Sequence, residues 1–431
     1  MDILPLLILV LSFIFFIGIG TPVAWSIAIS ALLTIIVSLP GMAAVTTIAQ
    51  RMGTGLDSFA LLAIPFFILS GQLMTHGGIA DRLIGFAKTM VGALPGGLAL
   101  INIIAAMLMG AIAGSAMASA SAMGSILGPK MEKEGYSKEY GAAVNITSAT
   151  IGLVIPPSNV LIVYSLASGG VSIAALFLAG YIPGILTGLF LMIVAAIWAK
   201  RKGYKTAETS SFGEIFKTFI VAFPSLLLLI IVIGGIVAGF FTATEASAIA
   251  VLYTLVLGFV YKEIKLKDLP NILLESSKTS AIVMLLIAAS MSMSWIMSYE
   301  NIPQNLSDLL LSISDNKIVI LLIINLLLLF VGIFMDMTPA VLIFTPIFLP
   351  VVKSIGIDPI QFGIIMVLNL CIGLCTPPVG SVLFVGIGIA KTSIEKVIKP
   401  LLPLFFAMIL ALILITFFPQ LTLWLPSVFG L

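Results

Sequence analysis

The chain has 431 residues, of which 61% are hydrophobic and 9% are charged, and its formal net charge is +2. A soluble domain carries roughly 25% charged residues, so a water-soluble fold is excluded because it could not bury this much apolar surface. The nearly balanced charge offers no basic surface for nucleic acid. One histidine, and two cysteines that both lie in one apolar segment, give no ligand set for a transition metal.

The first 92 residues predict scaffold spans and a connecting helix. Their opening run, Ile3 to Ile19, is followed by Thr21 and Pro22, where a cleavable signal would have small residues. The run also lacks the basic start of a signal sequence, so we interpret it as a retained span. Runs farther along, such as residues 219–240, reach the ~20 apolar residues that cross a bilayer. The chain is therefore predicted to be an all-α polytopic membrane protein.

Residues 93–175 form the first of two similar blocks. An apolar run leads into a stretch of small residues, Gly110 to Ser125, and a second run leads through a turn to a span interrupted by Pro156 and Pro157. Small residues let helices pack closely, which is one interpretation of this stretch. The other is the tip of a re-entrant hairpin, at which the chain turns back inside the membrane.

Residues 176–313 predict further scaffold spans with a cytoplasmic connector. Basic residues of short loops prefer the cytoplasm, and one loop here holds Lys200, Arg201, Lys202, Lys205 and Lys217. If this loop lies inside, only three of the 20 basic residues fall outside, and these are Arg51, Lys317 and Lys353. The same path predicts periplasmic N- and C-termini, with residues 397–431 as the last span.

Residues 314–396 repeat the first block at an offset of 221 positions. Residues 151–157 read IGLVIPP and residues 372–378 read IGLCTPP, while Pro129 and Gly135 match Pro350 and Gly356. The predicted path gives the two blocks opposite orientations. We therefore predict two inverted repeats, each with a re-entrant hairpin and a Pro-Pro-broken span. Inverted repeats place a substrate site at their interface near the midplane, which indicates a transporter.

The helix breaks supply oxygen ligands that suit sodium. Proline frees carbonyls of the preceding turn, and within the membrane these must be satisfied by protein, water or an ion. Hard oxygen ligands favour sodium over a soft metal, so two breaks predict two or more sodium sites. The candidate ligands are Gly114, Ser115, Ser119, Pro156, Ser158, Asn159, Met335, Asp336, Thr338, Thr376, Pro377 and Gly380.

Asp336 is the strongest single candidate. An ionisable group in the hydrocarbon zone is costly unless it faces protein, water or a counter-ion, which makes it a functional candidate. The alternative is that Asp336 caps a helix beginning at Thr338 or Pro339, because Asp suits an N-cap and Pro suits the first turn. The two roles can coexist.

A carboxylate substrate is predicted between the two tips. Helix N-termini there carry partial positive charge, and the predicted path places no lysine or arginine nearby. Backbone N–H groups and neutral polar side chains would then hold the substrate. The candidates are Ser119, Asn145, Thr147, Asn159 and Thr338. Asn145 can instead form a hydrogen bond between helices.

Taken together, five motifs resemble the large membrane subunit of tripartite ATP-independent periplasmic (TRAP) transporters. They are Gly114-Ser115, Ile155 to Asn159, Phe241 to Ala246, Asp336 to Pro339 and Thr376 to Gly380. The resemblance covers essentially the whole chain. It implies an elevator mechanism in the lipid of a bacterial inner membrane, in which a transport domain with both hairpins slides within a fixed scaffold. It also implies a separate small membrane subunit, and a periplasmic binding protein that delivers a carboxylate such as sialic acid or a C4-dicarboxylate.

Two other functions fit parts of the sequence. A stand-alone sodium- or proton-coupled carboxylate carrier would need no binding protein, and a channel or passive scaffold would not accumulate a solute against its gradient. An enzyme is not expected, because the spans contain no nucleophile paired with a base and no metal-ligand cluster. No phosphate-binding loop indicates ATP hydrolysis.

Overall fold

The computed structural model describes residues 3–204, 211–314 and 316–431. Lys205, one of the basic residues of the predicted cytoplasmic loop, lies outside the described residues. The first half contains α1 (Ile3–Gly18), α2 (Val23–Ser38), α3 (Gly41–Gly55), η1 (Phe59–Leu62), α4 (Ala63–His76), α5 (Ile79–Val91), α6 (Gly97–Ala113), α7 (Ala116–Lys133), α8 (Lys138–Ile151), α9 (Asn159–Ala167) and α10 (Ile173–Lys202). The second half contains α11 (Phe212–Val237), α12 (Ala243–Val260), α13 (Leu269–Tyr299), α14 (Ile302–Ile313), α15 (Lys317–Phe334), α16 (Met337–Ser354), α17 (Pro359–Leu374), α18 (Ser381–Ala390), α19 (Ile394–Phe417) and α20 (Gln420–Val428).

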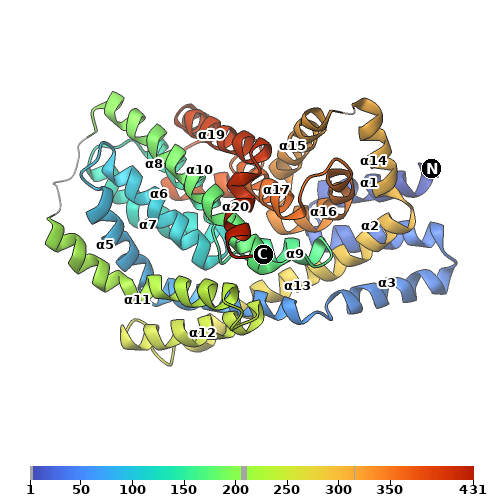
Figure 1. The fold of residues 1–431 in the computed structure, drawn as a ribbon, viewed down its shortest axis with the longest axis horizontal. Helices are drawn as coiled ribbons and strands as arrows, with labels where there is room; N and C mark the ends of the chain where they lie inside the picture. Colours follow the sequence, from blue (N-terminus) through green and yellow to red (C-terminus); the bar gives the residue numbers. More distant parts are fainter. Residues whose placement is uncertain (1–2, 205–210, 315) are drawn as a thin grey trace.

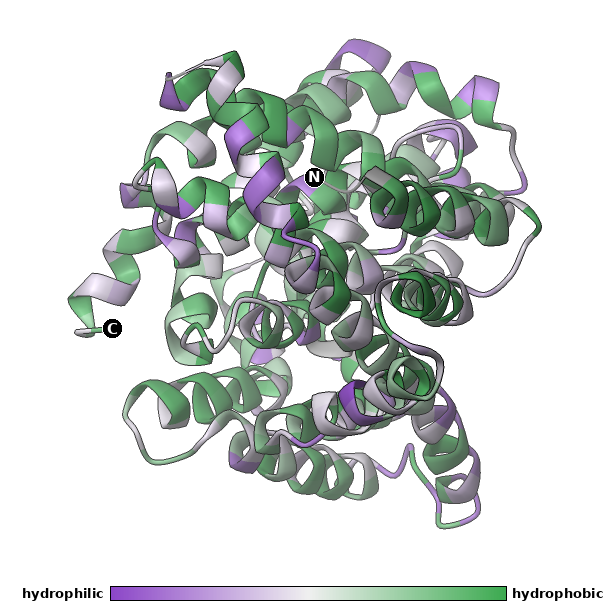
Figure 2. Ribbon diagram, turned by 90° about the vertical axis from the view of Figure 1, so that its right-hand side faces the viewer, coloured by the Kyte–Doolittle hydropathy of each residue, from purple (hydrophilic) through white to green (hydrophobic). Residues whose placement is uncertain are grey.

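The predicted all-α membrane fold is confirmed. Within the described residues, eight helical segments are long and apolar enough to cross a bilayer. Figure 2 shows hydrophobic residues along most of the helices. Large apolar side chains such as Phe15, Phe216 and Phe406 are exposed, which is rare over wide areas of a soluble protein. Their surface is suited to lipid, so the chain is a multi-pass membrane protein.

The helices repeat at the predicted offset of 221 positions. α7 starts at Ala116 and α16 starts at Met337, and both contain 18 residues. Packing partners are exchanged between the halves, since α2 contacts α13 while α12 contacts α4, and α9 contacts α16 while α18 contacts α7. An exchange of partners is what a two-fold rotation produces. The opposite orientation of the two halves in a bilayer stays a prediction.

The chain reverses at both predicted hairpin tips. α6 ends at Ala113 and α7 begins at Ala116, while α15 ends at Phe334 and α16 begins at Met337. The two arms of each hairpin contact each other. Of the stretch from Gly110 to Ser125, only Gly114 and Ser115 leave the helix, so the tips are shorter than the small-residue pattern indicated.

Both predicted Pro-Pro breaks are also present. α8 ends at Ile151 and α9 begins only at Asn159, and α17 ends at Leu374 while α18 begins at Ser381. The bonds Pro156–Pro157 and Pro377–Pro378 lie in these gaps, and both are cis. Each half therefore has one span made of two shorter helices.

A two-fold axis between the halves, as the prediction has it, would pass where α8 contacts α17. Thr150 and Cys371 occupy equivalent positions, and the Cys371 thiol donates to the Thr150 carbonyl at 3.0 Å. The hydroxyl of Thr150 also lies 3.4 Å from the sulfur of Cys375. Equivalent residues of two halves can touch only beside the rotation axis. Both cysteines are free and buried, as core residues would be.

The prediction divides the helices into a hairpin group, which contains the hairpins and broken spans, and a scaffold. In Figure 1, α3, α11, α12 and α13 lie along the lower edge, below the hairpins. The predicted boundaries assign residues 176–313 to the scaffold, but α10 packs against α6, α8, α17 and α19. These contacts favour grouping α10 with the hairpin blocks, and the domain boundaries stay predictions.

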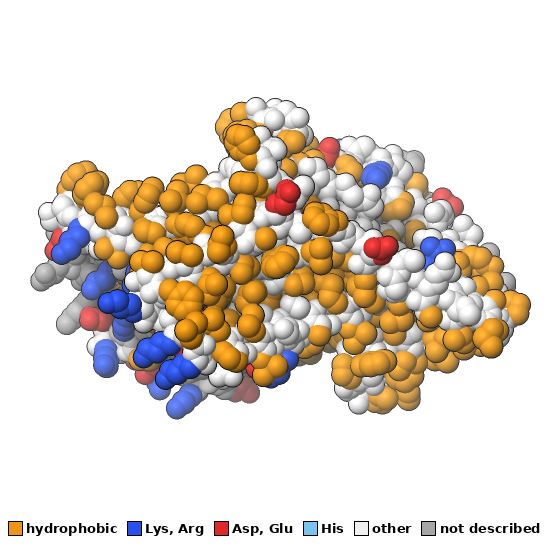
Figure 3. Space-filling model, turned by 90° about the horizontal axis from the view of Figure 1, so that it is seen from below, with side chains coloured by type: hydrophobic (Ala, Val, Ile, Leu, Met, Phe, Trp, Pro, Cys, Tyr) orange, Lys and Arg blue, Asp and Glu red, His pale blue; other side chains and the backbone are white. Residues whose placement is uncertain are grey.

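Basic side chains gather at one end of the molecule. α10 ends with Lys200, Arg201 and Lys202, and Figure 3 shows the main cluster of Lys and Arg side chains at this end of the face. A cluster on one side agrees with a cytoplasmic surface. The orientation of the termini stays a prediction.

Close approach of α6 and α8 gives a prediction about stability. A Cβ atom added at Gly152 would lie 2.5 Å from the Cα atom of Gly110. Backbone cannot rotate away as a side chain can, so Gly152→Ala is expected to push the helices apart at a cost of about 1–3 kcal/mol. The measurement is the midpoint of thermal unfolding in detergent, which should fall. Gly388→Ala is the control because nothing lies near its added Cβ, and equal midpoints for the two variants would contradict the packing described.

Candidate functional site

A cavity of about 330 Å³ lies where both hairpin tips face α4 and α13. Its volume falls within the ~300–1,000 Å³ of small-molecule sites. Its lining residues come from both halves and from both groups of helices. The polar ones, together with the tip glycine, are Gln72, Thr75, Gly114, Ser115, Asn159, Thr279, Asp336 and Thr338.

Three helices begin at the wall of this cavity. α7 starts at Ala116, α9 at Asn159 and α16 at Met337, and all three residues line the cavity. The first turn of each helix has backbone N–H groups without intrahelical partners and a partial positive charge. The cavity therefore has a lining that favours an anion, although no lysine or arginine is among its described lining residues.

The first tip is shaped by Gly114 and Ser115. Gly114 has a φ of +61°, and an added Cβ would lie 2.5 Å from the side-chain nitrogen of Asn159. The hydroxyl of Ser115 accepts a hydrogen bond from the N–H of Ala118 at 3.2 Å and so caps α7. The tip thus packs directly on the start of α9, and only glycine fits its backbone.

The second tip carries Asp336, which is the only ionisable residue among the described residues that line the cavity. Asp336 occupies the N-cap position of α16, but its side chain makes no capping hydrogen bond. The residue is exposed, and it lines the cavity. Asp336 thus stands both at the start of α16 and on the cavity wall, so the two predicted roles can coexist. Thr338 lines the same part of the cavity.

The other predicted sodium ligands are not among the residues that line the cavity. The hydroxyl of Ser158 donates to the carbonyl of Leu153, and that of Thr376 donates to the carbonyl of Ile372 at 2.7 Å. These bonds satisfy carbonyls of the two broken spans with side chains of the breaks themselves. The remaining predicted ligands that do not line the cavity are Ser119, Pro156, Met335, Pro377 and Gly380.

Three predicted substrate ligands lie away from the cavity. The hydroxyl of Ser119 donates to the carbonyl of Ala106 at 2.9 Å and joins the two arms of the first hairpin. Thr147 donates to the carbonyl of Ala143 within its own helix. The amide of Asn145 donates to the carbonyl of Ala120 at 2.7 Å, which is the interhelical alternative. Of the predicted substrate ligands, the cavity therefore contains Asn159 and Thr338.

Sequence reasoning missed the polar residues of the scaffold wall. Gln72 and Thr75 on α4 and Thr279 on α13 face the hairpin tips across the cavity. An amide such as Gln72 within an apolar span was the available signal, because a polar group in a span is costly without a partner. The sequence does not reveal which scaffold helices lie opposite the tips.

Comparisons with known proteins agree with this architecture. Residues 10–421 match the family described as "Tripartite ATP-independent periplasmic transporter, DctM component". The chain is 57% identical to the uncharacterized protein YgiK of Salmonella typhimurium, over 99% of this chain and 98% of that protein. It is 41% identical to the sialic acid TRAP transporter large permease protein SiaM of Vibrio cholerae, over 95% and 96% of the two chains. It is 39% identical to the C4-dicarboxylate TRAP transporter large permease protein DctM of Rhodobacter capsulatus, over 94% and 96%.

A solved structure shares the fold at low sequence identity. The YdaH transporter of Alcanivorax borkumensis superposes with a TM-score of 0.64 at 14% identity, over 86% of this chain and 87% of that one. The family match spans nearly the whole chain, and the two relatives named as large permeases cover 95% and 94% of it. The chain therefore belongs to the DctM component family of the tripartite ATP-independent periplasmic transporters, and it is a transport protein, not an enzyme.

Proposed function

We propose that this chain is the large membrane subunit of a sodium-coupled secondary transporter that imports a small organic anion into a bacterium. The observation that carries the proposal is the cavity between the hairpin tips. It combines three helix N-termini with one carboxylate, Asp336, and with no basic side chain among its described lining residues. Such a cavity suits an anion and a cation that bind together.

The proposed substrate class is a carboxylate. Helix N-termini bind carboxylates through backbone N–H groups and the helix dipole, and the N-termini of α7, α9 and α16 lie at the cavity. Two relatives are named for sialic acid and for C4-dicarboxylates, and their identities to this chain are nearly equal. We infer the shared acid group and assign no single compound.

Sodium coupling follows from the charge of the cavity. A carboxylate substrate and Asp336 would repel each other inside a protein of low dielectric constant. A sodium ion held between them by Asp336, Thr338 and backbone carbonyls of the tips would remove that repulsion. Sodium and substrate would then each raise the affinity for the other, since such coupling is reciprocal. The first tip and the adjacent break offer a second set of oxygens at Ser115 and Asn159.

The partners and the movement follow from the family. Its transporters are tripartite by description, so we propose a small membrane subunit and a periplasmic binding protein as partners of this chain. The cavity lies between the hairpin group and scaffold helices α4 and α13. That position suits an elevator mechanism, in which the hairpin group carries the cavity past a fixed scaffold in the inner membrane. We propose periplasmic termini, with the lysine-rich end of α10 in the cytoplasm.

Uptake by proteoliposomes tests the proposed function. The complex of both membrane subunits should accumulate a labelled carboxylate only with an inward sodium gradient and with added binding protein. Potassium in place of sodium should abolish accumulation, because the proposed cycle takes its energy from the sodium gradient. Accumulation without binding protein would instead indicate a stand-alone carrier, and equilibration without accumulation would indicate a channel.

A further inference from the structure

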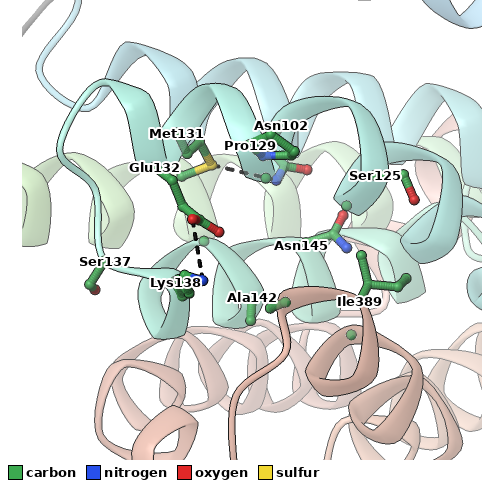
Figure 4. A pocket seen from close by; sticks show the side chains of 15 residues that line it. Asn102, Ser125, Pro129, Met131, Glu132, Ser137, Lys138, Ala142, Asn145 and Ile389 are labelled. Carbon is green, nitrogen blue, oxygen red and sulfur yellow. Dashed lines mark hydrogen bonds and ion pairs between the residues drawn. The ribbon is translucent and has the colours of Figure 1, made fainter.

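A second pocket, of about 180 Å³, lies on the far side of the first hairpin from its tip. α6, α7 and α8 form three of its walls, and α18 of the second half forms the fourth through Gly386, Ile389 and Ala390. Figure 4 shows Glu132 and Lys138 at one side of this pocket and Asn145 at the other. None of these residues lines the cavity between the tips, so the two spaces are separate.

Two buried carboxamide oxygens in the pocket lack partners. The side-chain oxygens of Asn102 and Asn145 receive no hydrogen bond from any described residue, and the two residues are 1% and 2% exposed. The amide nitrogen of Asn145 donates to the carbonyl of Ala120, which leaves the oxygen as the unpaired end of this amide. A buried polar atom without a partner destabilises a fold, because it has lost its hydrogen bonds to water. Two such atoms beside one pocket therefore indicate a ligand that accepts electron pairs from oxygen.

The second half fills the equivalent space with apolar side chains. At the offset of 221, Asn102 and Asn145 correspond to Ile323 and Met366, and Gly128 and Gly141 correspond to Leu349 and Phe362. Met366 and Phe362 are fully buried. The helices of the second half therefore pack without such a pocket. At the equivalent positions the first half has amides and glycines in place of large apolar side chains.

The helix that covers the space differs in the same direction. The space in the second half is covered by α9, which comes from the first half. The ring of Tyr164 on α9 lies against Gly363, and the Tyr164 hydroxyl donates to the carbonyl of Pro359 at 2.6 Å. The pocket in the first half is covered by α18, which comes from the second half and has Val385 at the position equivalent to Tyr164. The pocket of the first half therefore lacks both the tyrosine ring that covers the equivalent space and the large side chains that fill it.

The chemistry of the lining selects the class of ligand. Two carbonyl-type oxygens repel an anion, and the pocket offers no thiolate or imidazole for a soft metal. Its one carboxylate, Glu132, pairs with Lys138 at 3.4 Å, whereas calcium sites gather several carboxylates. We propose that this pocket binds a monovalent cation through the side-chain oxygens of Asn102 and Asn145, with Glu132 near its mouth. The ion would join α6 of the first hairpin to α8.

Replacement by the second-half residues tests the site. The purified full chain in detergent is titrated with radioactive sodium, and Asn102→Ile with Asn145→Met is expected to bind one ion fewer per chain than the unchanged protein. Met366→Leu is the matched control, because it alters buried bulk at the position equivalent to Asn145 and should leave the number of ions unchanged. Substrate is absent throughout, so failure of the proposed transport function would not alter this result.

A second variant keeps the test decisive if the double substitution does not fold. Asn102→Asp retains an oxygen and adds a charge. Among the described residues, the amide nitrogen that it removes contacts the sulfur of Met131 at 4.0 Å. This variant should tighten sodium binding at this pocket by about tenfold, which corresponds to 1.4 kcal/mol. The proposal would be overturned if Asn102→Asp, or a double variant that folds, bound the same number of sodium ions with the same affinity as the unchanged protein. The pocket would then hold only water.

Discussion

Asp336→Asn should raise the sodium concentration needed for half-maximal uptake by about tenfold to a hundredfold. The carboxylate lines the cavity and makes no capping bond, so its charge is available to the coupling ion. Hydrogen bonds and contacts to charged groups contribute about 1.5–3 kcal/mol, and each 1.4 kcal/mol is a factor of ten. Uptake is measured in proteoliposomes at several sodium concentrations with the binding protein in excess.

The control for this variant is Asp358→Asn in the same half. The side chain of Asp358 accepts a hydrogen bond from the N–H of Ile360 at 2.7 Å and caps α17. Asparagine caps helices about as well as aspartate, so this change removes a charge and keeps the cap. Sodium dependence should remain that of the unchanged protein. If Asp336→Asn and Asp358→Asn behaved alike, Asp336 would have no part in coupling.

Gly114→Ala should reduce uptake at least tenfold while the protein still inserts and folds. Gly114 lies in the left-handed region, where an L-residue costs roughly 1–2 kcal/mol, and its added Cβ would collide with the side chain of Asn159. Both effects displace the first tip from the start of α9, where the proposed ligands of the cavity meet. Initial uptake rates at saturating sodium measure the loss.

Gly135→Ala separates the strain from the collision. Gly135 has a φ of +85°, in the turn after α7, and nothing lies within 4 Å of its added Cβ. It carries a similar backbone penalty without touching the cavity, so uptake should stay near that of the unchanged protein. Equal losses in both variants would show that backbone strain alone, and not the geometry of the tip, limits transport.

The repeat made most of the fold predictable from the sequence. Proline and glycine in register at an offset of 221 located both hairpins and both broken spans. The agreement between the two copies was the signal, because a single proline does not locate a break: Pro183 and Pro224 lie inside continuous helices. The extent of the tips was overestimated. Residues such as Ser119 and Ser121 have small side chains, but they remain helical in α7, since small residues serve close packing as well as unwinding.

The site was predicted less completely than the fold. Asp336 was found because a charge in an apolar segment has few other interpretations, and Gly114 because it lies in the small-residue stretch of the first predicted hairpin. Ser119 and Thr147 were not separable from true ligands, because the sequence does not say whether a hydroxyl turns to a cavity or to a nearby carbonyl. Gln72 and Thr279 were missed because the contact between the hairpins and the scaffold depends on tertiary packing.

The two cysteines at the axis have a practical consequence. Cys371 and Cys375 are the only cysteines of the chain, and both are sealed between α8 and α17 at 0% exposure. A thiol introduced on a surface would therefore be the sole reactive one, without removal of any native residue. One spin or fluorescent label on α4 and one on the first hairpin could then report displacement between these helices in a lipid bilayer. The buried native cysteines would not react with the label.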